Sequence, residues 1–116
     1  MSEYGDTSIK FHNWWNAPAT WAKIQSIDST GSHANWMENF PWTRLVHAPA
    51  PAGEKAQVDM ALMKASAPAQ VRAILGDGSF GGLWQRPDED MLAIWETGVA
   101  ETRAALEGPW GEIAND

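Results

Sequence analysis

The placement of proline and glycine between residues 28 and 53 limits the possible folds more than any other feature of the chain. These residues are Gly31, Pro41, Pro49, Pro51 and Gly53. The apolar residues between them follow neither the period of 2 typical of strands nor the period of 3.6 typical of helices, so we expect a long irregular loop. Loops of this length are usually either functional or disordered.

Tryptophan is abundant, with eight residues in a chain of 116. Its side chain combines a large apolar surface with one N–H group, which suits it to cores, to interfaces and to the walls of pockets for polar ligands. The aromatic residues within or near the irregular loop are Trp21, Trp36, Phe40 and Trp42. They argue against disorder, and the tryptophan count indicates more buried surface than so small a chain needs for itself.

The segment from Thr7 to Trp15 has the pattern of a strand. It is rich in β-branched and aromatic residues, and Ile9 and Phe11 alternate with Lys10 and His12. The sequence offers no evident pairing partner for such a strand, so its N–H and C=O groups would form an exposed edge. We therefore expect the chain to be part of a larger sheet.

Three segments have helical patterns, at 54–66, 67–75 and 88–106, and residues 20–28 fit a short helix opened by Thr20 as its cap. Ser66 is the expected cap of the helix at 67–75, and Gly76 its end. Between that helix and the last one lies GDGSFGG, residues 76–82, which must turn tightly. It lacks the GK[ST] ending of a phosphate-binding loop, so a simple turn is the favoured interpretation.

The segment 88–106 is the clearest helix. Acidic residues fill its first turn, where the helix dipole favours negative charge. Gly98 lies inside it and would allow another helix to approach closely. Its apolar stripe consists of Leu92, Trp95, Val99 and Leu106. Together these patterns predict an α/β chain, residues 1–116 forming a single domain with one or two strands, two or three helices and the long Trp/Pro-rich loop.

Charge and composition exclude several classes of function. A net charge of −7 opposes binding to nucleic acid, which requires clustered Lys and Arg. No apolar run is long enough to span a membrane, and MSEYGDTSIK lacks the order of a secretory signal. We therefore expect a cytoplasmic protein that contacts neither nucleic acid nor membrane. Because cysteine is absent, any metal site must use His, Asp and Glu.

The stretch GSHANWMENFPWTR, residues 31–44, contains the main candidates for chemistry, His33 and Glu38. An imidazole and a carboxylate can bind Zn²⁺, Mn²⁺ or Fe²⁺, or can act as a base and its orienting group. Five positions apart, they converge only if the backbone between them is irregular. A structural histidine is the competing interpretation. Candidate walls of a pocket for a polar ring, or equally core or interface anchors, are Trp14, Trp15, Trp36 and Trp42.

Several of these motifs together resemble the C-terminal half of the creatininase family of metal-dependent amidohydrolases. That family carries His-Ala-Gly, two residues, then Glu-Thr-Ser. Here HANWMENF keeps His33, Ala34 and Glu38, while Asn35, Asn39 and Phe40 replace Gly, Thr and Ser. PAQV at 68–71 resembles the family's Pro-x-x-Val element, and its Gly-Asp-rich loop and final helix follow. The sequence HANWMENFPWTR is most similar to 3-dehydro-scyllo-inosose hydrolase-like members, which act on oxidised inositols.

The resemblance implies a fold, an activity and roles for single residues. The fold would be part of a three-layer α/β/α sandwich, usually in a homo-oligomer. His33 would contact substrate or shuttle protons, Glu38 would bind a divalent metal or lie next to a ligand of one, and Asn35 and the tryptophans above would line the substrate pocket. The family's Glu-x-His pair, bridging Asp and Gly-His-Gly-Gly-Asn-like loop have no counterpart here.

The expected function is therefore that of a C-terminal portion, or separate subunit, of a hydrolase that opens a small cyclic amide or cyclitol-type substrate. A partner chain carrying the N-terminal half, or copies of this chain, would complete it. Zn, Mn or Fe would bind in the complete assembly, and the isolated chain would bind no metal and be inactive. The alternative is a non-catalytic module that holds a polar or sugar-like ring between Trp36, Trp42 and Trp84, or a degenerate fragment.

Overall fold

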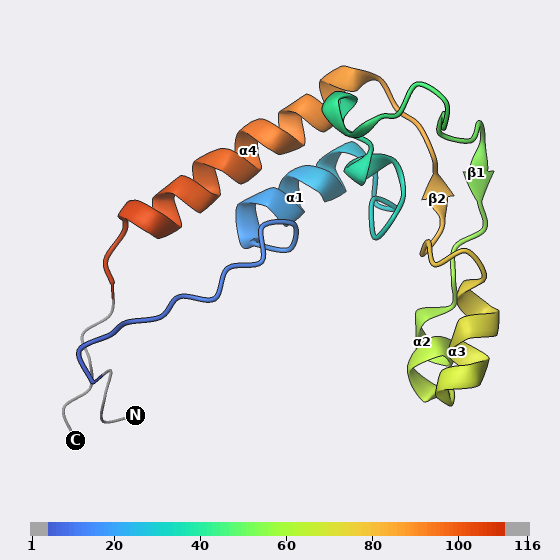
Figure 1. Ribbon diagram of the computed structural model, residues 1–116, viewed down its shortest axis with the longest axis horizontal. Coiled ribbons are helices and arrows are strands. Elements are labelled where there is room, and N and C mark those ends of the chain that lie inside the picture. The colour runs from blue at the N-terminus through green and yellow to red at the C-terminus, as the bar shows by residue number, and fades with distance from the viewer. Residues whose placement is uncertain (1–4, 111–116) are drawn as a thin grey trace.

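A computed structural model describes residues 5–110, and these residues form a small mixed α/β fold (Figure 1). The chain order is α1 (Pro18–Ile27), two 3₁₀ turns η1 (Trp36–Glu38) and η2 (Pro41–Thr43), β1 (Glu54–Lys55), α2 (Met60–Ala65), α3 (Pro68–Leu75), β2 (Gly82–Leu83) and α4 (Asp88–Glu107). Each of the four α-helices of the described part overlaps one of the four segments with helical patterns, whereas the expected fold class had two or three helices. Residues 1–4, on which the expectation about a secretory signal partly rests, lie outside the described residues.

The molecule is open and elongated. Helices α1 and α4 lie together in one arm, and α2 and α3 project from the other end beyond the two strands (Figure 1). Its Cα radius of gyration is 18.2 Å, whereas a compact domain of about 100 residues has about 13 Å. Its accessible surface is 8381 Å², about 2000 Å² more than a compact protein of this mass exposes. The fold therefore leaves unusually much surface uncovered.

A small core lies where α1, α4 and the irregular loop meet. Its buried apolar side chains are Ile24, Trp36, Met37, Phe40, Met91 and Ile94. The loop reaches this core by a close turn at Gly31, where an added Cβ would lie 2.6 Å from Ile24 Cγ2 and 3.0 Å from Trp36 Cζ2. The aromatic residues thus order the loop, as the sequence predicts. Buried tryptophan contributes strongly here because its surface is so large.

Helix α1 begins at Pro18 rather than at Thr20, which is not its cap. Its N-cap residue is Ala17, whose side chain offers no acceptor. Glu101 of α4 takes over this role, since its carboxylate accepts hydrogen bonds from the Ala19 N–H at 2.7 Å, the Thr20 N–H at 2.8 Å and the Thr20 hydroxyl at 2.7 Å. A negative charge at the start of a helix also satisfies the helix dipole. Glu101 thereby joins the two helices.

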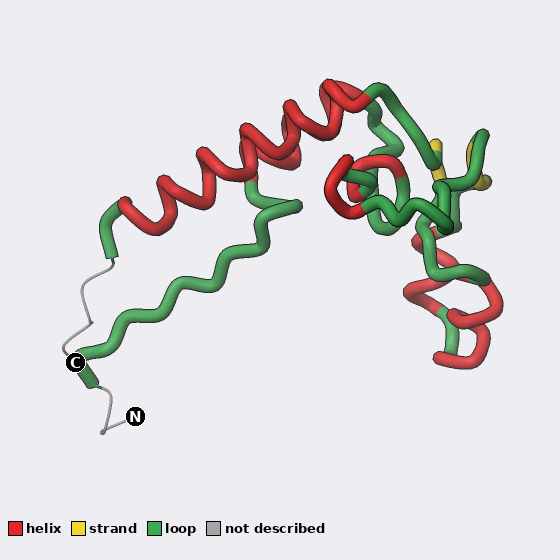
Figure 2. Tube along the Cα trace, turned by 45° about the horizontal axis from the view of Figure 1, so that its top comes forward, coloured by secondary structure: helices red, strands yellow, loops and turns green. Residues whose placement is uncertain are grey.

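The predicted strand at Thr7–Trp15 is wrong. Residues 7–13 are extended but belong to neither strand of the two-stranded sheet in the described part. That sheet lies far from them, at the other end of the molecule (Figure 2). The alternation instead serves contacts with α4. Lys10 Nζ donates to the carbonyl of Ala105 at 2.5 Å, near the end of α4, and His12 Nε2 lies 2.9 Å from Thr102 Oγ1. Ile9 and Phe11 point outward, 78% and 91% exposed.

The sheet is antiparallel, and Glu54 pairs with Leu83 and Lys55 with Gly82. This pairing overturns the predicted helix at 54–66, because the chain is still extended at 54–55 and α2 starts only after Asp59, whose carboxylate caps it. Ser66 ends α2 and does not cap α3, which follows Ala67. Gly76 ends α3 with φ +64°, as the sequence predicts.

The last helix forms as predicted, and its core face is made by residues outside the apolar stripe seen in the sequence. The buried residues are Met91, Ile94 and Gly98, because α1 packs there and an added Cβ at Gly98 would lie 3.7 Å from Thr20 Oγ1. The expected stripe is turned away from the core, with exposed fractions of 43% for Leu92, 48% for Trp95, 46% for Val99 and 63% for Leu106. Among residues 5–110, no helix is long and apolar enough to cross a membrane.

Candidate functional site

The HANWMENF segment is held by Asn35. This side chain is only 4% exposed and makes four hydrogen bonds. Its Nδ2 donates to the carbonyls of Thr30 and Gly81, both at 2.8 Å, and its Oδ1 accepts from the N–H groups of Ser32 and Met37, both at 3.2 Å. Every donor and acceptor of the amide is occupied. Asn35 therefore connects the loop to the glycine turn and starts η1, and no polar atom of it is left for a ligand.

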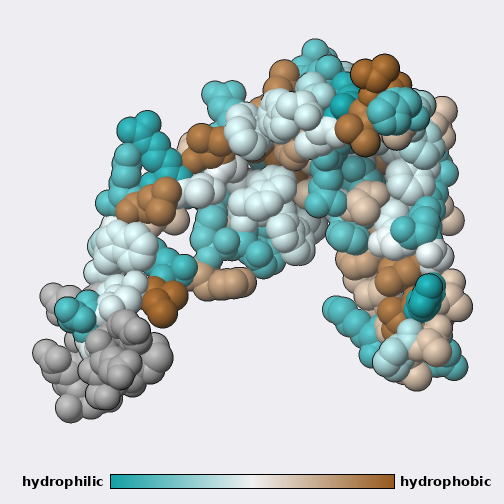
Figure 3. Space-filling model, in the orientation of Figure 1, coloured by the Kyte–Doolittle hydropathy of each residue, from teal (hydrophilic) through white to brown (hydrophobic). Residues whose placement is uncertain are grey.

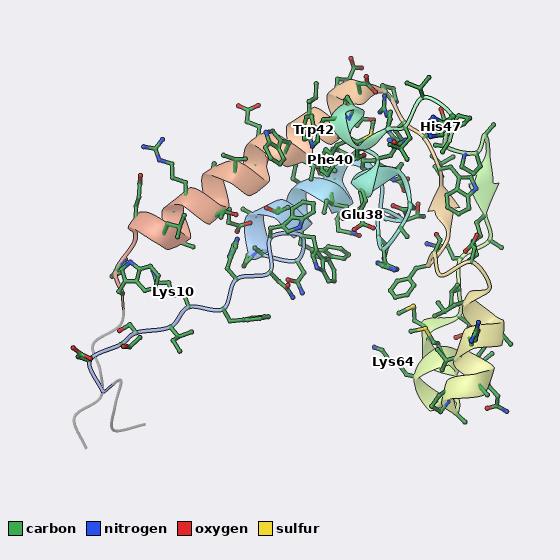
Figure 4. All side chains as sticks on the ribbon, viewed as in Figure 1. Lys10, Glu38, Phe40, Trp42, His47 and Lys64 are labelled. Atoms are coloured by element: carbon green, nitrogen blue, oxygen red, sulfur yellow. The ribbon has the colours of Figure 1, made fainter. Side chains whose placement is uncertain are left out.

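The structure brings His33 and Glu38 together. His33 Nδ1 lies 3.9 Å from Glu38 Oε2, and the two side chains are 56% and 43% exposed. The same Glu38 oxygen accepts a hydrogen bond from the Ala34 N–H. Glu38 is the last residue of η1 and lies below Phe40 in Figure 4. The pair is reachable from solvent, and the carboxylate is fixed by the backbone in front of the imidazole.

The backbone between them is irregular in a specific way. Ala34 has φ +54°, and it is the only residue other than glycine with positive φ in the described part. This conformation costs a residue with a Cβ roughly 1 kcal/mol. It reverses the chain directly after His33, so that η1 can carry Glu38 back toward the imidazole. Strained backbone often accompanies functional sites, and here it is what produces the His33–Glu38 pair.

A cavity of about 370 Å³ is lined by Ser32 and Phe80, which both neighbour His33, but neither His33 nor Glu38 is part of its wall. Its walls are aromatic at Trp15, Trp21 and Phe80, and polar at Ser29, Thr30, Ser32 and Gln57. Phe80 also packs against His33, with ring centroids 4.9 Å apart, and its N–H donates to the His33 carbonyl at 3.1 Å. The cavity is within the size range of small-molecule sites. We call it the Trp15–Phe80 cavity.

The predicted pocket tryptophans do not share one pocket. Trp15 lines the Trp15–Phe80 cavity, and its ring meets that of Trp21 edge-on at 6.2 Å. Trp14 lies in a separate groove against α4. Trp36 is fully buried, and its Nε1 donates to Asp28 Oδ2 at 3.1 Å. Trp42 is 55% exposed and stacks on Phe40 at 5.2 Å, which Figure 4 shows beside α4.

Asp28 anchors the start of the loop electrostatically. Burial raises the pKa of its carboxyl group, but hydrogen bonds from the Thr30 N–H and hydroxyl and from Trp36, with the nearby Arg86 charge, outweigh it and hold the pKa below its ordinary value. Arg86 Nη1 lies 4.0 Å from Asp28 Oδ2. Asp28 is therefore a structural carboxylate, ionised at neutral pH and committed to the loop.

The described residues alone do not fit a metal centre. His33 and Glu38 offer two donors, whereas protein metal sites of this type use three or more. Within residues 5–110, no group of three or more His, Asp or Glu side chains could hold a metal ion. At 3.9 Å the carboxylate makes no hydrogen bond to the imidazole, so a small approach of the two groups is needed before Glu38 could orient the His33 ring for proton transfer.

Phe80, Trp21 and Gln57 were missed as candidates from the sequence. Trp21 stands out only as an aromatic residue near the loop, and Phe80 only as the one large side chain within GDGSFGG. Their meeting depends on the hydrogen bonds that join Asn35 and His33 to the glycine turn.

Comparisons of the chain with protein-family models, with curated proteins and with solved structures find no match.

Proposed function

We propose that this chain is the C-terminal portion, or a separate subunit, of a cytoplasmic creatininase-like hydrolase that opens a small cyclic amide or cyclitol-type substrate. The observation that carries the proposal is the His33–Glu38 pair, 3.9 Å apart on a constrained loop, with Phe80 linking His33 to a cavity of substrate size. The HANWMENF segment carries the resemblance to the family. The geometry supports a joint role for His33 and Glu38, because it brings their side chains together.

In this proposal His33 is the proton-transferring group. Its ring is reachable from solvent, packs on Phe80 and faces a carboxylate, so it can accept a proton from an attacking water or donate one to a leaving atom. Glu38 is fixed by the Ala34 N–H and would orient the imidazole. The metal that the family requires is not accommodated by these two residues, so its ligands would come mainly from a partner chain.

The uncovered surface supports the need for a partner. The extended segment at residues 7–13 exposes Ile9 and Phe11 and pairs with no strand of the described part, and about 2000 Å² of surface is exposed beyond that of a compact protein. A partner carrying the missing half would add strands here. The assembly would then form the three-layer α/β/α sandwich, and the chain alone would be inactive.

The test is a substitution in the assembly purified from the host. His33→Ala is expected to reduce hydrolysis at least about a hundredfold while leaving the assembly intact, since general acid–base catalysis contributes on that order. His47→Ala is the matched control, because His47 is exposed and lies near β1, away from the pair (Figure 4). Turnover of the His33 variant within about tenfold of the wild type would contradict the proposal.

A second candidate function rests on the Trp15–Phe80 cavity itself. Its aromatic walls can stack on the apolar face of a polar ring while hydroxyl and amide groups satisfy the ring's own hydroxyls. This differs from a site between Trp36, Trp42 and Trp84, which fails because Trp36 is fully buried.

The isolated, metal-free chain distinguishes the two functions. A saturable tryptophan-fluorescence change on titration with myo-inositol, lost in Trp15→Ala and kept in Trp110→Ala, would favour the binding module. If no saturable change is observed, the cavity would bind only a substrate that requires the complete assembly.

A further inference from the structure

The apolar stripe on α4 that faces away from the core has the spacing of a helix-pairing surface. The positions Leu92, Trp95, Val99, Thr102 and Leu106 alternate steps of three and four residues along the whole helix. This is the a/d pattern by which one helix packs against another. Its four apolar members are between 43% and 63% exposed. On the arm that carries α4, Figure 3 shows separate brown patches among teal and white surface.

A groove accompanies this stripe. A cavity of about 380 Å³ opens between Trp14 and the α4 residues Trp95, Val99 and Leu106. At its upper end Trp42 extends the apolar surface, since its ring meets that of Trp95 edge-on at 4.8 Å. Exposed tryptophans at a continuous apolar patch are typical of an interface.

The charges beside the stripe indicate what covers it. In the same heptad pattern Glu96 and Arg103 both occupy the position that flanks the seam on one side. When two such helices pair antiparallel, these flanking positions face one another. Glu96 then lies beside the partner's Arg103 and Arg103 beside the partner's Glu96. The same register places Trp95 against the partner's Leu106 and Val99 against the partner's Thr102.

We propose that α4 pairs antiparallel with α4 of a second copy of this chain. A two-fold interface requires one surface that complements itself. Both the interlocking seam positions and the opposite charges at Glu96 and Arg103 meet that requirement; Thr102 is the one polar seam position, and its hydroxyl already contacts His12 of its own chain. The surplus of about 2000 Å² of exposed surface is enough for an interface of ordinary size, which buries about 1600 Å² in total. This pairing does not depend on the hydrolase assignment.

The test is the mass of the chain in solution, measured by sedimentation equilibrium over a concentration series reaching about 100 µM, where an interface of this size is populated. The wild-type chain is expected to dimerise. Val99→Glu puts a carboxylate into the seam and is expected to weaken the dimer at least about tenfold. The matched control is Ala104→Glu on the exposed side of α4 opposite the seam, which is expected to leave the dimer unchanged. Circular dichroism verifies that each variant is folded.

Charge reversal distinguishes this pairing from any other contact. Glu96→Arg alone places like charges at both ends of the seam and weakens the dimer, whereas Glu96→Arg combined with Arg103→Glu restores it. A monomeric wild-type chain would assign the face to a different occupant and overturn the proposal. So would a dimer that Val99→Glu leaves unchanged, or a double reversal that fails to restore what the single reversal weakens.

Discussion

Glu101→Ala is expected to destabilise the chain more than any other exchange of a charged residue on α4. Glu101 accepts hydrogen bonds from two backbone N–H groups in the first turn of α1 and from the hydroxyl of Thr20. Hydrogen bonds to a charged group contribute about 1.5–3 kcal/mol each, but water can replace the carboxylate at the exposed Ala19 N–H. It cannot reach Thr20, which is fully buried. We therefore expect a loss of about 2–4 kcal/mol.

The assay is urea unfolding at neutral pH, followed by tryptophan fluorescence and circular dichroism. Glu107→Ala on the same helix is the control, because Glu107 has only an exposed i, i+4 pair with Arg103, 2.8 Å apart, and should cost at most about 0.5 kcal/mol. Glu101→Gln keeps the size and one acceptor oxygen and should lie between the two. If Glu101→Ala unfolds within about 0.5 kcal/mol of the control, Glu101 does not cap α1.

The same residue predicts a pH dependence. Partial burial raises the pKa of Glu101, but hydrogen bonds from Thr20 and Ala19 and the charge of His12 outweigh it, so the pKa lies below its ordinary value of 4.5. A carboxylate with a lowered pKa contributes stability that is present above the unfolded value and is lost as the pH falls through the folded one. Stability should therefore decline below about pH 4.5, and less steeply in Glu101→Gln. Equal slopes in the two proteins would refute this assignment.

Two further predictions concern the loop and the glycine turn. Gly81→Ala should cost at least about 2 kcal/mol in urea unfolding and Gly78→Ala only about 1 kcal/mol. The two glycines have similar φ, +98° and +95°, so the backbone strain of an alanine would be similar at both. An added Cβ at Gly81 would also lie 2.5 Å from the Ala56 carbonyl oxygen, whereas at Gly78 it would meet nothing within 4 Å. Equal losses of stability would show that this steric clash at Gly81 does not contribute. Asn35→Ala should cost about 3–5 kcal/mol, since two buried and two partly buried partners lose their hydrogen bonds. Asn39→Ala, which removes an exposed hydrogen bond from Arg44, should cost less than about 1 kcal/mol. An Asn35 variant as stable as the Asn39 variant would contradict the structural role of Asn35.

The sequence predicts the helical elements where the signals are local. Gly76 ends α3 because a positive φ is cheap only for glycine, and the acidic first turn of α4 is visible in the sequence itself. Alternation at residues 7–13 misleads, because it reports what side chains prefer and not whether a backbone partner exists. Here the alternate residues Lys10 and His12 bind α4 instead.

Two other features depend on contacts far apart in the chain. Periodicity identifies the apolar residues of α4 but cannot say which of its two adjacent apolar faces packs against the core. Gly98 and Glu101 hold α1 against the face that contains Met91 and Ile94. At the candidate site the residue types single out His33 and Glu38. Phe80 could not be predicted, because it reaches His33 only through the glycine turn.

The central claim is that this chain works as part of a larger metal-dependent hydrolase, and native mass spectrometry with metal analysis of the chain isolated from its host tests it most directly. The account predicts a complex with a different chain of similar size, carrying about two transition-metal ions per pair. A metal-free complex of two copies alone would support the α4 pairing and contradict the hydrolase. A metal-free chain without any partner would contradict both.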